Sequence, residues 1–524
     1  MVRVGDRRIC LIHLSTGVHA IDNACPHEGY GLTQGELVGD QLTCVWHNWK
    51  FRVTDGQCTQ GEENIDVHSV RVDPDGTIGI ALRTSDPSER KAALLQSLRR
   101  GIERDYVGQI SRDVVRLLKA SANPGELVWE AVAFGVPRAE YGWGHSIASA
   151  TDCLTIANEL EGDDRALPIV QAIAGVSESE RGRPIEPLPD PMSSLPNDAK
   201  KQFRRAIEGE QLAHAQALVR TAIHEGCSAE ELSSWFRSAV CDHHLSYGHG
   251  AIYAQKAFEL LGAIGWDRAD TVLPYLVPSI IYATREDKLP YMKPFMKQLA
   301  QSDLGPLAAI PVREWDGCEM LVEALLGANR TYAFESAVMA LASGAGVGGL
   351  LDACVVASSE RLLRYDVTGE RDLLDDFNWL DITHGLTYAH AARWHHQAAL
   401  DDHDGHQTVQ LALFCTFLTF WTGRHEWHTR IADRLPPHPM SDTTHTYGLA
   451  LQQQALLDPA ASFIHQVHAI KTSRAAALEA NRLQSNIPLL AAQRFLEAPK
   501  QQRFVASTVA RSLEFVNGRQ PRGE

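Results

Sequence analysis

Hydrophobic and polar positions divide this chain into two parts with different patterns. Up to about residue 82, apolar residues occur in short runs bounded by turn residues, as in Ile9–Leu14 and Val18–Ile21 around the turn Ser15–Gly17. Such runs are typical of β-strands joined by hairpins. The same pattern returns at 42–45, 49–53, 67–72 and 77–82. We therefore expect residues 1–83 to form a small all-β domain.

After the polar stretch Thr84–Ser88 the period changes. From Lys91 onward apolar residues recur three and four positions apart, for example Leu94, Leu98 and Ile102, which indicates amphipathic helices. The predicted fold class is multidomain α+β, with the small all-β domain followed by a large all-α helical-repeat domain. We expect a linker and first helix at 84–100 and the helical domain at 101–515. A proline-rich loop is expected near 176–200.

The helical part contains a repeated unit, in which a histidine lies between small residues. The units are Gly144-His145-Ser146, Gly248-His249-Gly250 and, less closely, Thr383-His384-Gly385. A helix-like pattern follows each one, and a Leu-Pro pair follows the first two. Repeats of this length suggest stacked helical pairs. Each copy is expected to place its histidine at the start of a helix, where the helix dipole favours the neutral, metal-binding imidazole.

Charge and composition exclude several classes of function. The formal net charge of −16 argues against nucleic acid as the main partner. No run of eighteen apolar residues occurs, so no transmembrane helix and no membrane partner are expected. Ten cysteines in 524 residues suggest reduced thiols rather than a disulfide framework. A cytoplasmic protein is the expectation.

Two short motifs in the β-rich part each pair one cysteine with one histidine. Cys25-Pro26-His27 is followed, after sixteen residues, by Cys44-Val45-Trp46-His47. Two thiolates and two imidazoles are the ligands of a Rieske [2Fe-2S] cluster. The motifs resemble a Rieske ferredoxin-type domain. The alternative is a zinc site, but zinc sites usually place two cysteines together and then two histidines. Some membrane-bound Rieske proteins carry an extra cysteine in each loop, and these two can form a disulfide. This chain lacks both cysteines, which favours the soluble type of Rieske domain.

A helix near the C-terminus adds a second candidate site. In His465-Gln466-Val467-His468-Ala469-Ile470-Lys471 the last histidine and the lysine lie three residues apart, so they share a helix face. The surrounding residues are apolar, and burial favours a neutral lysine. A neutral lysine can add carbon dioxide and become an anionic oxygen ligand. The competing interpretations are a packed core histidine and a lysine that extends to the surface.

His145, His249, His384 and the pair His468 and Lys471 resemble the motifs of the questin oxidase-like proteins. This resemblance covers roughly residues 100–510. It implies an α-helical fold, a non-haem iron held by histidines and a carboxylated lysine, and oxygen-dependent cleavage of an aromatic polyketide ring such as an anthraquinone. The N-terminal Rieske-type domain departs from that family. Ordinary Rieske oxygenases hold their iron with two histidines and a carboxylate in a strand-rich domain, which this chain does not have.

The sequence therefore predicts an oxidoreductase, a Rieske-coupled non-haem iron oxygenase. Cys25, His27, Cys44 and His47 would hold the cluster. The Fe(II) ligands would be His145, His249, His384, His468 and Lys471. The expected partners are O2, an apolar aromatic, polyketide or quinone-type substrate, and an external reductase for the cluster.

Several alternatives stay open at this point. His390, His445 or His465 could replace one of the proposed ligands. The helical part could be a docking scaffold for an electron-transfer protein without a second metal, or an interaction surface with a Rieske redox sensor. The aromatic residues Tyr141, Trp143 and Tyr247 could line the substrate pocket or only pack. The glycine-rich segment 344–349 follows a helical run rather than a strand, so close helix packing or a loop is favoured over nucleotide binding.

Overall fold

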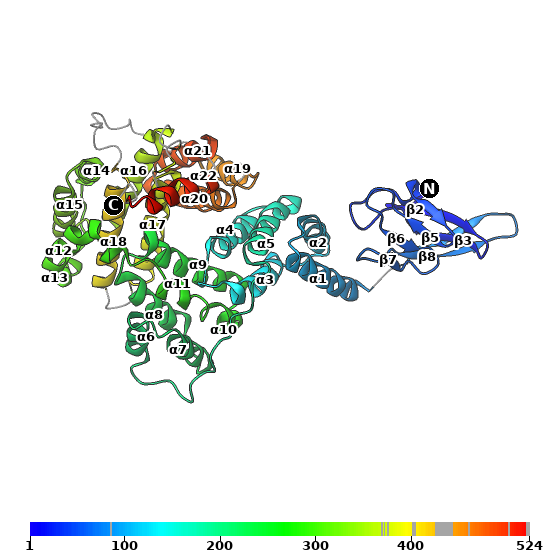
Figure 1. The fold of residues 1–524 in the computed structure, drawn as a ribbon, viewed down its shortest axis with the longest axis horizontal. Coiled ribbons are helices and arrows are strands. Elements are labelled where there is room, and N and C mark those ends of the chain that lie inside the picture. The colour runs from blue at the N-terminus through cyan, green and yellow to red at the C-terminus, as the bar shows by residue number, and fades with distance from the viewer. Residues whose placement is uncertain are drawn as a thin grey trace. The chain divides into compact units, whose positions relative to one another are not determined.

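The computed structural model describes residues 1–83, 86–367, 370, 373–374, 377–400, 405–424, 444–459, 462–500 and 504–519. The chain divides into two compact units, Met1–Ala122 and Asn123–Glu524. Figure 1 shows β-sheets near the N-terminus and helices in the rest of the chain. The predicted fold class, a small β domain followed by a large helical region, is confirmed.

A five-stranded antiparallel sheet forms one layer of the β domain, in the order β1-β2-β3-β8-β9. Its strands are β1 (Val2–Val4), β2 (Arg7–Leu14), β3 (Gly17–Asp22), β8 (Val67–Val72) and β9 (Ile78–Ala81). β2 and β3 form the predicted hairpin, with Leu14 opposite Gly17. The turn at 73–76 joins β8 to β9, where Val72 pairs with Ile78.

A second sheet has the order β4-β5-β6-β7. Its strands are β4 (Glu36–Val38), β5 (Gln41–Thr43), β6 (Lys50–Arg52) and β7 (Cys58–Gln60). The hydrophobic core of the domain includes Ile21, Leu42 and Phe51, and Cys25 and Cys44 are buried in the same cluster. The loops that carry the two motifs are therefore anchored by their cysteines in the core.

Two helices complete the first unit, α1 (Pro87–Glu103) and α2 (Val107–Lys119). Asp86 caps α1 by accepting a hydrogen bond from the Ser88 amide, and Pro87 occupies the first helical turn, where a missing N–H costs nothing. The helix thus begins inside the predicted linker, four residues before Lys91.

The second unit is helical. Four of its helices carry the predicted histidines, namely α4 (His145–Glu159), α9 (His249–Ile264), α17 (Trp379–Gln397) and α20 (Phe463–Leu483). The other α-helices are α3 (Pro124–Gly135), α5 (Ala166–Glu180), α6 (Ala199–Glu208), α7 (Leu212–His224), α8 (Ala229–Cys241), α10 (Ala269–Val272), α11 (Val277–Ile281), α12 (Lys293–Gln301), α13 (Leu304–Ala308), α14 (Cys318–Leu326), α15 (Arg330–Ala342), α16 (Gly346–Arg364), α18 (Gly405–Trp421), α19 (Thr444–Ala455), α21 (Ile487–Glu497) and α22 (Phe504–Val516).

The repeated histidine units differ in their position on the helices. His145 and His249 are the first residues of α4 and α9, as predicted. The prediction for the third unit is wrong, because His384 lies inside α17, which begins five residues earlier. Asn378 and Asp381 form a capping box at that earlier start, and this cap signal, rather than the small residues beside His384, sets the helix terminus.

The two irregular segments noted in the sequence have structural explanations. The proline-rich region follows the end of α5 at Glu180 and runs to the start of α6 at Ala199. The glycine-rich segment forms the beginning of α16, where a Cβ on Gly349 would lie 3.2 Å from the ring of Trp315. Close packing therefore explains these glycines. The polar run at 401–406 also predicts a short loop, of which residues 401–404 lie outside the described residues.

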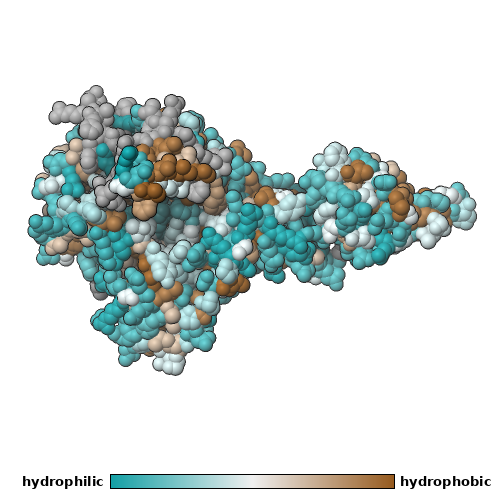
Figure 2. Space-filling view, in the orientation of Figure 1, coloured by the Kyte–Doolittle hydropathy of each residue, from teal (hydrophilic) through white to brown (hydrophobic). Residues whose placement is uncertain are grey.

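The face drawn in Figure 2 is mainly polar (teal), with apolar patches (brown) between the polar areas. Within the described ranges, every helix is too short or too polar to cross a lipid bilayer.

Candidate metal centres

The two Cys-His motifs lie in loops with the same backbone geometry. In the first loop, the Gly29 amide donates to the Cys25 carbonyl over 2.7 Å, and the Cys25 amide donates to the Tyr30 carbonyl over 2.8 Å. The second loop repeats both bonds, from Asn48 to Cys44 and from Cys44 to Trp49. Gly29 and Asn48 both adopt positive φ, which glycine and asparagine tolerate best. Each loop therefore turns sharply, with its cysteine at the base.

The four motif side chains converge between these loops. Cys25 and Cys44 lie in the same buried cluster, and the His27 and His47 ring centroids are 4.3 Å apart. Burial raises the pKa of Cys25 to about 12, while the amides of His27 and Glu28 act in the opposite direction. A buried thiolate here thus needs a cation beside it.

These residues fit a [2Fe-2S] cluster. Cys25 and Cys44 are each 2% exposed, and His27 Nδ1 is buried without a hydrogen-bond partner among the described residues. Two buried thiols and a bare imidazole nitrogen are three of the four donor atoms that a Rieske cluster needs, and His47 would supply the fourth. The Nε2 atom of His27 is hydrogen-bonded to the Tyr106 hydroxyl, from the turn before α2. The side chain of His47 remains 37% exposed, so His47 is the more accessible of the two.

In the helical unit, the four helices that carry the predicted histidines enclose a second site. α4 packs against α9 and α20, and α17 packs against the same two helices. One nitrogen from each of His145, His249, His384 and His468 lies within 4.8 Å of the others. The structure thus brings together all four predicted histidines from distant parts of the sequence.

Hydrogen bonds on the outer side of the rings fix which nitrogen faces the centre. Nδ1 of His384 donates to the Leu380 carbonyl over 2.5 Å, and Nδ1 of His468 donates to the Ile464 carbonyl over 2.7 Å. Their Nε2 atoms are then unprotonated and point inward, 3.3 Å apart. The Nε2 atoms of His384 and His249 are 2.9 Å apart.

This arrangement fits a bound cation. Burial, together with the neighbouring rings and Lys471, lowers the pKa of His145, His249 and His468 well below its usual value, and that of His384 to about 3. The rings are therefore neutral near pH 7, and their converging lone pairs repel one another unless a positive ion lies between them. Backbone carbonyls behind ligating histidines are a common feature of metal sites.

Lys471 lies beside the histidines, on the same face of α20 as His468. It is 3% exposed, and its Nζ has no hydrogen-bond partner in the part of the chain that the structure describes. Burial lowers the pKa of Lys471 to about 8, so a substantial fraction of the amine is uncharged in mildly alkaline solution. The surface-lysine interpretation does not fit this burial.

The alternative histidines lie outside this group. His390 is hydrogen-bonded to Glu479 over 2.8 Å, His445 is exposed near the start of α19, and His465 is buried but is not among the four converging rings. Among the aromatic candidates, Tyr247 lies with its ring centroid 5.8 Å from that of His384. Tyr141 is 63% exposed and contacts Tyr282 instead.

Sequence reasoning missed three residues next to this site. The Tyr253 ring stacks on His249 at 5.2 Å, and its hydroxyl lies 3.3 Å from His145 Nδ1. Asp152 and Lys256 form a buried ion pair over 2.9 Å. Tyr253 follows His249 by four residues, and Asp152 and Lys256 each follow a histidine by seven. These helical spacings could have identified them.

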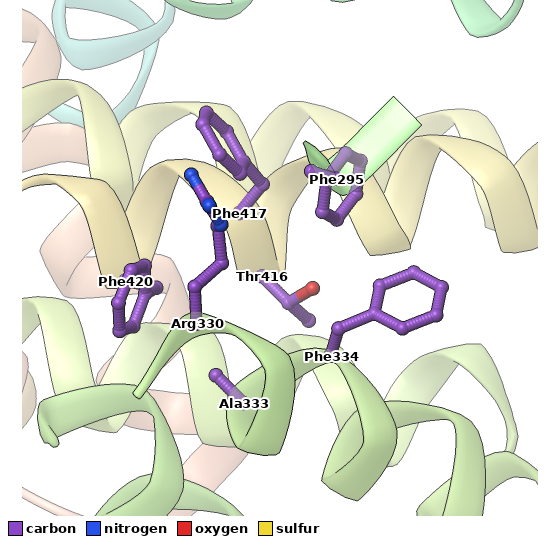
Figure 3. Close-up of a pocket in the computed structure, with 7 residues that line it drawn as sticks. All are labelled: Phe295, Arg330, Ala333, Phe334, Thr416, Phe417 and Phe420. Atoms are coloured by element: carbon purple, nitrogen blue, oxygen red, sulfur yellow. The ribbon is translucent and has the colours of Figure 1, made fainter. Parts of the chain in front are cut away.

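The site is more accessible on one side than on the other. His384 and His468 are buried, whereas His145 and His249 are partly exposed. A separate aromatic pocket, between α12, α15 and α18, is lined by Phe295, Phe334, Phe417 and other residues (Figure 3). Its volume of about 10 Å³ holds roughly one water molecule, so it is too small for an organic substrate.

Comparison with known proteins identifies the N-terminal domain. Residues 1–71 match the family described as "Rieske [2Fe-2S] domain". No solved structure matches the chain.

Relatives align with this chain only over short segments. A 4beta-methylsterol monooxygenase of Methylococcus capsulatus is 38% identical over 60 residues, 11% of this chain and 16% of the relative. The ferredoxin component of an alkene monooxygenase system of Xanthobacter autotrophicus is 38% identical over 55 residues, 10% of this chain and 45% of the relative. The ferredoxin component of naphthalene 1,2-dioxygenase/salicylate 5-hydroxylase systems of a Ralstonia species is 28% identical over 74 residues, 14% and 71% of the two chains.

The chain thus spans less than half the length of the first two relatives, and these names describe oxygenases and the ferredoxins that serve them. The loop geometry, the four converging side chains and the family match agree, and residues 1–71 form a Rieske [2Fe-2S] domain.

Proposed function

We propose that the chain is a Rieske-coupled non-haem iron oxygenase. The cluster is held by Cys25, His27, Cys44 and His47. A single Fe(II) is held by His145, His249, His384 and His468, with Lys471 as an anionic ligand. When bound, the cluster supplies electrons one at a time and the iron supplies dioxygen activation.

The main support for the proposal is that the Nε2 atoms of His384 and His468 in the helical unit are unprotonated. Two of the rings donate their Nδ1 protons to carbonyls one turn back in the same helix. Their Nε2 lone pairs then lie 3.3 Å apart in a buried site. A buried polar atom without a partner costs free energy. A divalent cation between the rings removes this cost.

Lys471 would complete the site after it reacts with carbon dioxide. The neutral Nζ attacks the carbon of CO2, an N–C bond forms, one C=O pair moves to oxygen, and the nitrogen loses one proton to solvent. The product is a carbamate with one negative charge. Four neutral imidazoles leave the charge of Fe(II) uncompensated in an apolar surrounding, which is costly, and the carbamate offsets part of it.

Other side chains would hold the ligands and admit the substrate. Tyr253 stacks on His249 and supports His145 through its hydroxyl. The partly exposed edge at His145 and His249 is where an organic substrate would approach. For the class of substrate, an aromatic polyketide or quinone whose ring or C–C bond is cleaved, the support is the resemblance to the questin oxidase-like proteins.

Electrons would come from an external reductase through the Rieske domain. Relatives of this domain include ferredoxin components of oxygenase systems. Linking the carrier and the oxygenase in one polypeptide raises the effective concentration of the donor at its acceptor.

Those same ferredoxin relatives favour a second candidate, an electron-transfer protein whose helical unit is a docking scaffold without a metal. Nitric oxide distinguishes the two functions. The reduced protein should bind nitric oxide and give a high-spin paramagnetic signal in addition to that of the cluster. His384→Ala should lose this added signal and keep the cluster signal. If the wild-type protein gives only the cluster signal, the second candidate is correct.

A further inference from the structure

A buried group of charges lies two helical turns along from the histidines. Asp152 follows His145 by seven residues on α4, and Lys256 follows His249 by seven on α9. Seven residues are about two turns, or about 10 Å along a helix, so these side chains occupy the same faces as the histidines. Asp152 is 2% exposed and Lys256 is 6% exposed.

These charges are only partly paired. Lys256 Nζ lies 2.9 Å from Asp152 Oδ1 and 2.8 Å from a Glu259 carboxylate oxygen. The second oxygen of Asp152, Oδ2, is buried and has no hydrogen-bond partner within the described ranges. Lys256 therefore neutralises Asp152 but leaves one of its acceptor atoms free.

Lys471 has a buried hydrogen-bond donor that lacks a partner among the described residues. Its Nζ makes no hydrogen bond to any described residue. Lys471 and Asp152 lie in the same stretch of the contact between α20 and α4. On one side of them the His468 and His145 ring centroids are 4.8 Å apart, and on the other side Arg474 pairs with Glu159 over 2.8 Å. A free acceptor and a free donor in one buried region are costly unless a ligand or modification joins them.

We propose that Asp152 is the positioning residue for the carboxylated form of Lys471. A carbamate keeps one N–H, and Asp152 Oδ2 accepts it. That bond directs the two carbamate oxygens away from Asp152 and towards the histidines. Lys256 holds the Asp152 carboxylate in place and offsets its charge, so that Asp152 does not retain Lys471 as an ammonium ion. The inference rests on the proposed function.

Asp152→Asn tests this role, because it places an NH2 donor opposite the N–H of Lys471 at nearly unchanged volume. The full chain, stripped of the helical-site metal by a chelator, is dialysed against Co2+ with bicarbonate, and bound cobalt is counted separately from cluster iron. We expect roughly tenfold to hundredfold weaker cobalt binding. Zinc-loaded protein in 13C-labelled bicarbonate should also lose its carbamate carbon signal in nuclear magnetic resonance spectra. Asp352→Asn, which removes a carboxylate from the ion pair with Arg393, is the matched control and should change neither result.

The same exchange in the Lys471→Ala variant separates a positioning role of Asp152 from a general effect on folding. In Lys471→Ala, acetate should replace the missing carbamate, and adding Asp152→Asn should then have no further effect on cobalt affinity. An equal loss in both backgrounds would overturn the proposal. Full cobalt binding by Asp152→Asn alone would overturn it too and would leave the iron site intact. Full cobalt binding by Lys471→Ala without acetate would instead refute the lysine ligand itself, and the proposal with it.

Discussion

Nε2 of His249 and Nε2 of His384 lie 2.9 Å apart, although 135 residues separate them in the sequence. His249 starts α9 and His384 lies inside α17, and the two helices pack against each other. Nδ1 of His384 and Nδ1 of His468 both donate to carbonyls, so the Nε2 lone pairs of these two rings also face each other, 3.3 Å apart. Facing lone pairs are an unfavourable arrangement in a folded core. The fold therefore maintains this arrangement at a cost in stability, as expected at a functional site.

The N-terminal cluster gives the first prediction. Purified protein should be brown, and its reduced form should have an average g value near that of Rieske centres. His47→Cys should lower the reduction potential towards about −400 mV, the value typical of all-thiolate plant-type ferredoxins, because an anionic sulfur replaces a neutral imidazole. Potentiometric titration followed by paramagnetic resonance measures both. A colourless protein that contains zinc would contradict the assignment.

Lys471 gives the second prediction. Lys471→Ala should weaken metal binding in the helical unit by at least roughly tenfold and abolish turnover, and a short carboxylic acid should partly restore both. Lys471→Arg should not restore them, because a guanidinium stays charged and cannot be carboxylated. Metal dialysis and oxygen consumption report the two effects. Full activity of Lys471→Arg would make Lys471 a packing residue.

The third prediction compares the two glycines that precede His145 and His249 at the starts of α4 and α9. Gly248 has φ +91°, and a Cβ there would lie 2.3 Å from the ring of Tyr388. Gly248→Ala should therefore destabilise the protein by roughly 2–4 kcal/mol and displace His249. Gly144 precedes His145 in the same way, but has no described atom within 4 Å of its Cβ position. Gly144→Ala should change stability by less than about 1 kcal/mol. Denaturant unfolding measures the stability of both variants. Equal losses of stability would show that close packing against Tyr388 does not explain the effect.

His395 gives the fourth prediction, on pH. Burial lowers the pKa of His395 to about 4, whereas an unfolded histidine has a pKa of about 6.5. Between these values the unfolded state binds the additional proton, so stability falls as the pH decreases from about 6.5 to 4, by up to about 3 kcal/mol. Thermal unfolding of the helical unit should show this loss, and His395→Gln should reduce it. His445→Gln, the same exchange at an exposed position in α19, is the matched control variant.

The sequence predicted which histidines the structure brings together, but it predicted the geometry of their helices less well. The mixed Cys-His spacing predicted a Rieske domain, which the family match supports, because both motifs are short and local in sequence. The convergence of His145 with His468 depends on how α4 and α20 pack, which periodicity does not specify. His384 shows the limit most clearly. Its small neighbours suggested a helix start, whereas the capping box at Asn378 begins α17 earlier. Asp152 and Lys256 were overlooked because single charged residues in helices are usually exposed.

The iron content of the intact chain tests the central claim most directly. Cluster iron accounts for about two irons per chain. With the helical site loaded, we predict about three, and about two in each of His145→Ala, His249→Ala and His384→Ala with the Rieske spectrum unchanged. His465→Ala, a buried histidine of α20 outside the converging group, should keep three. Two irons in the wild-type protein after anaerobic loading with Fe(II) and bicarbonate, or three in all of the variants, would contradict the account.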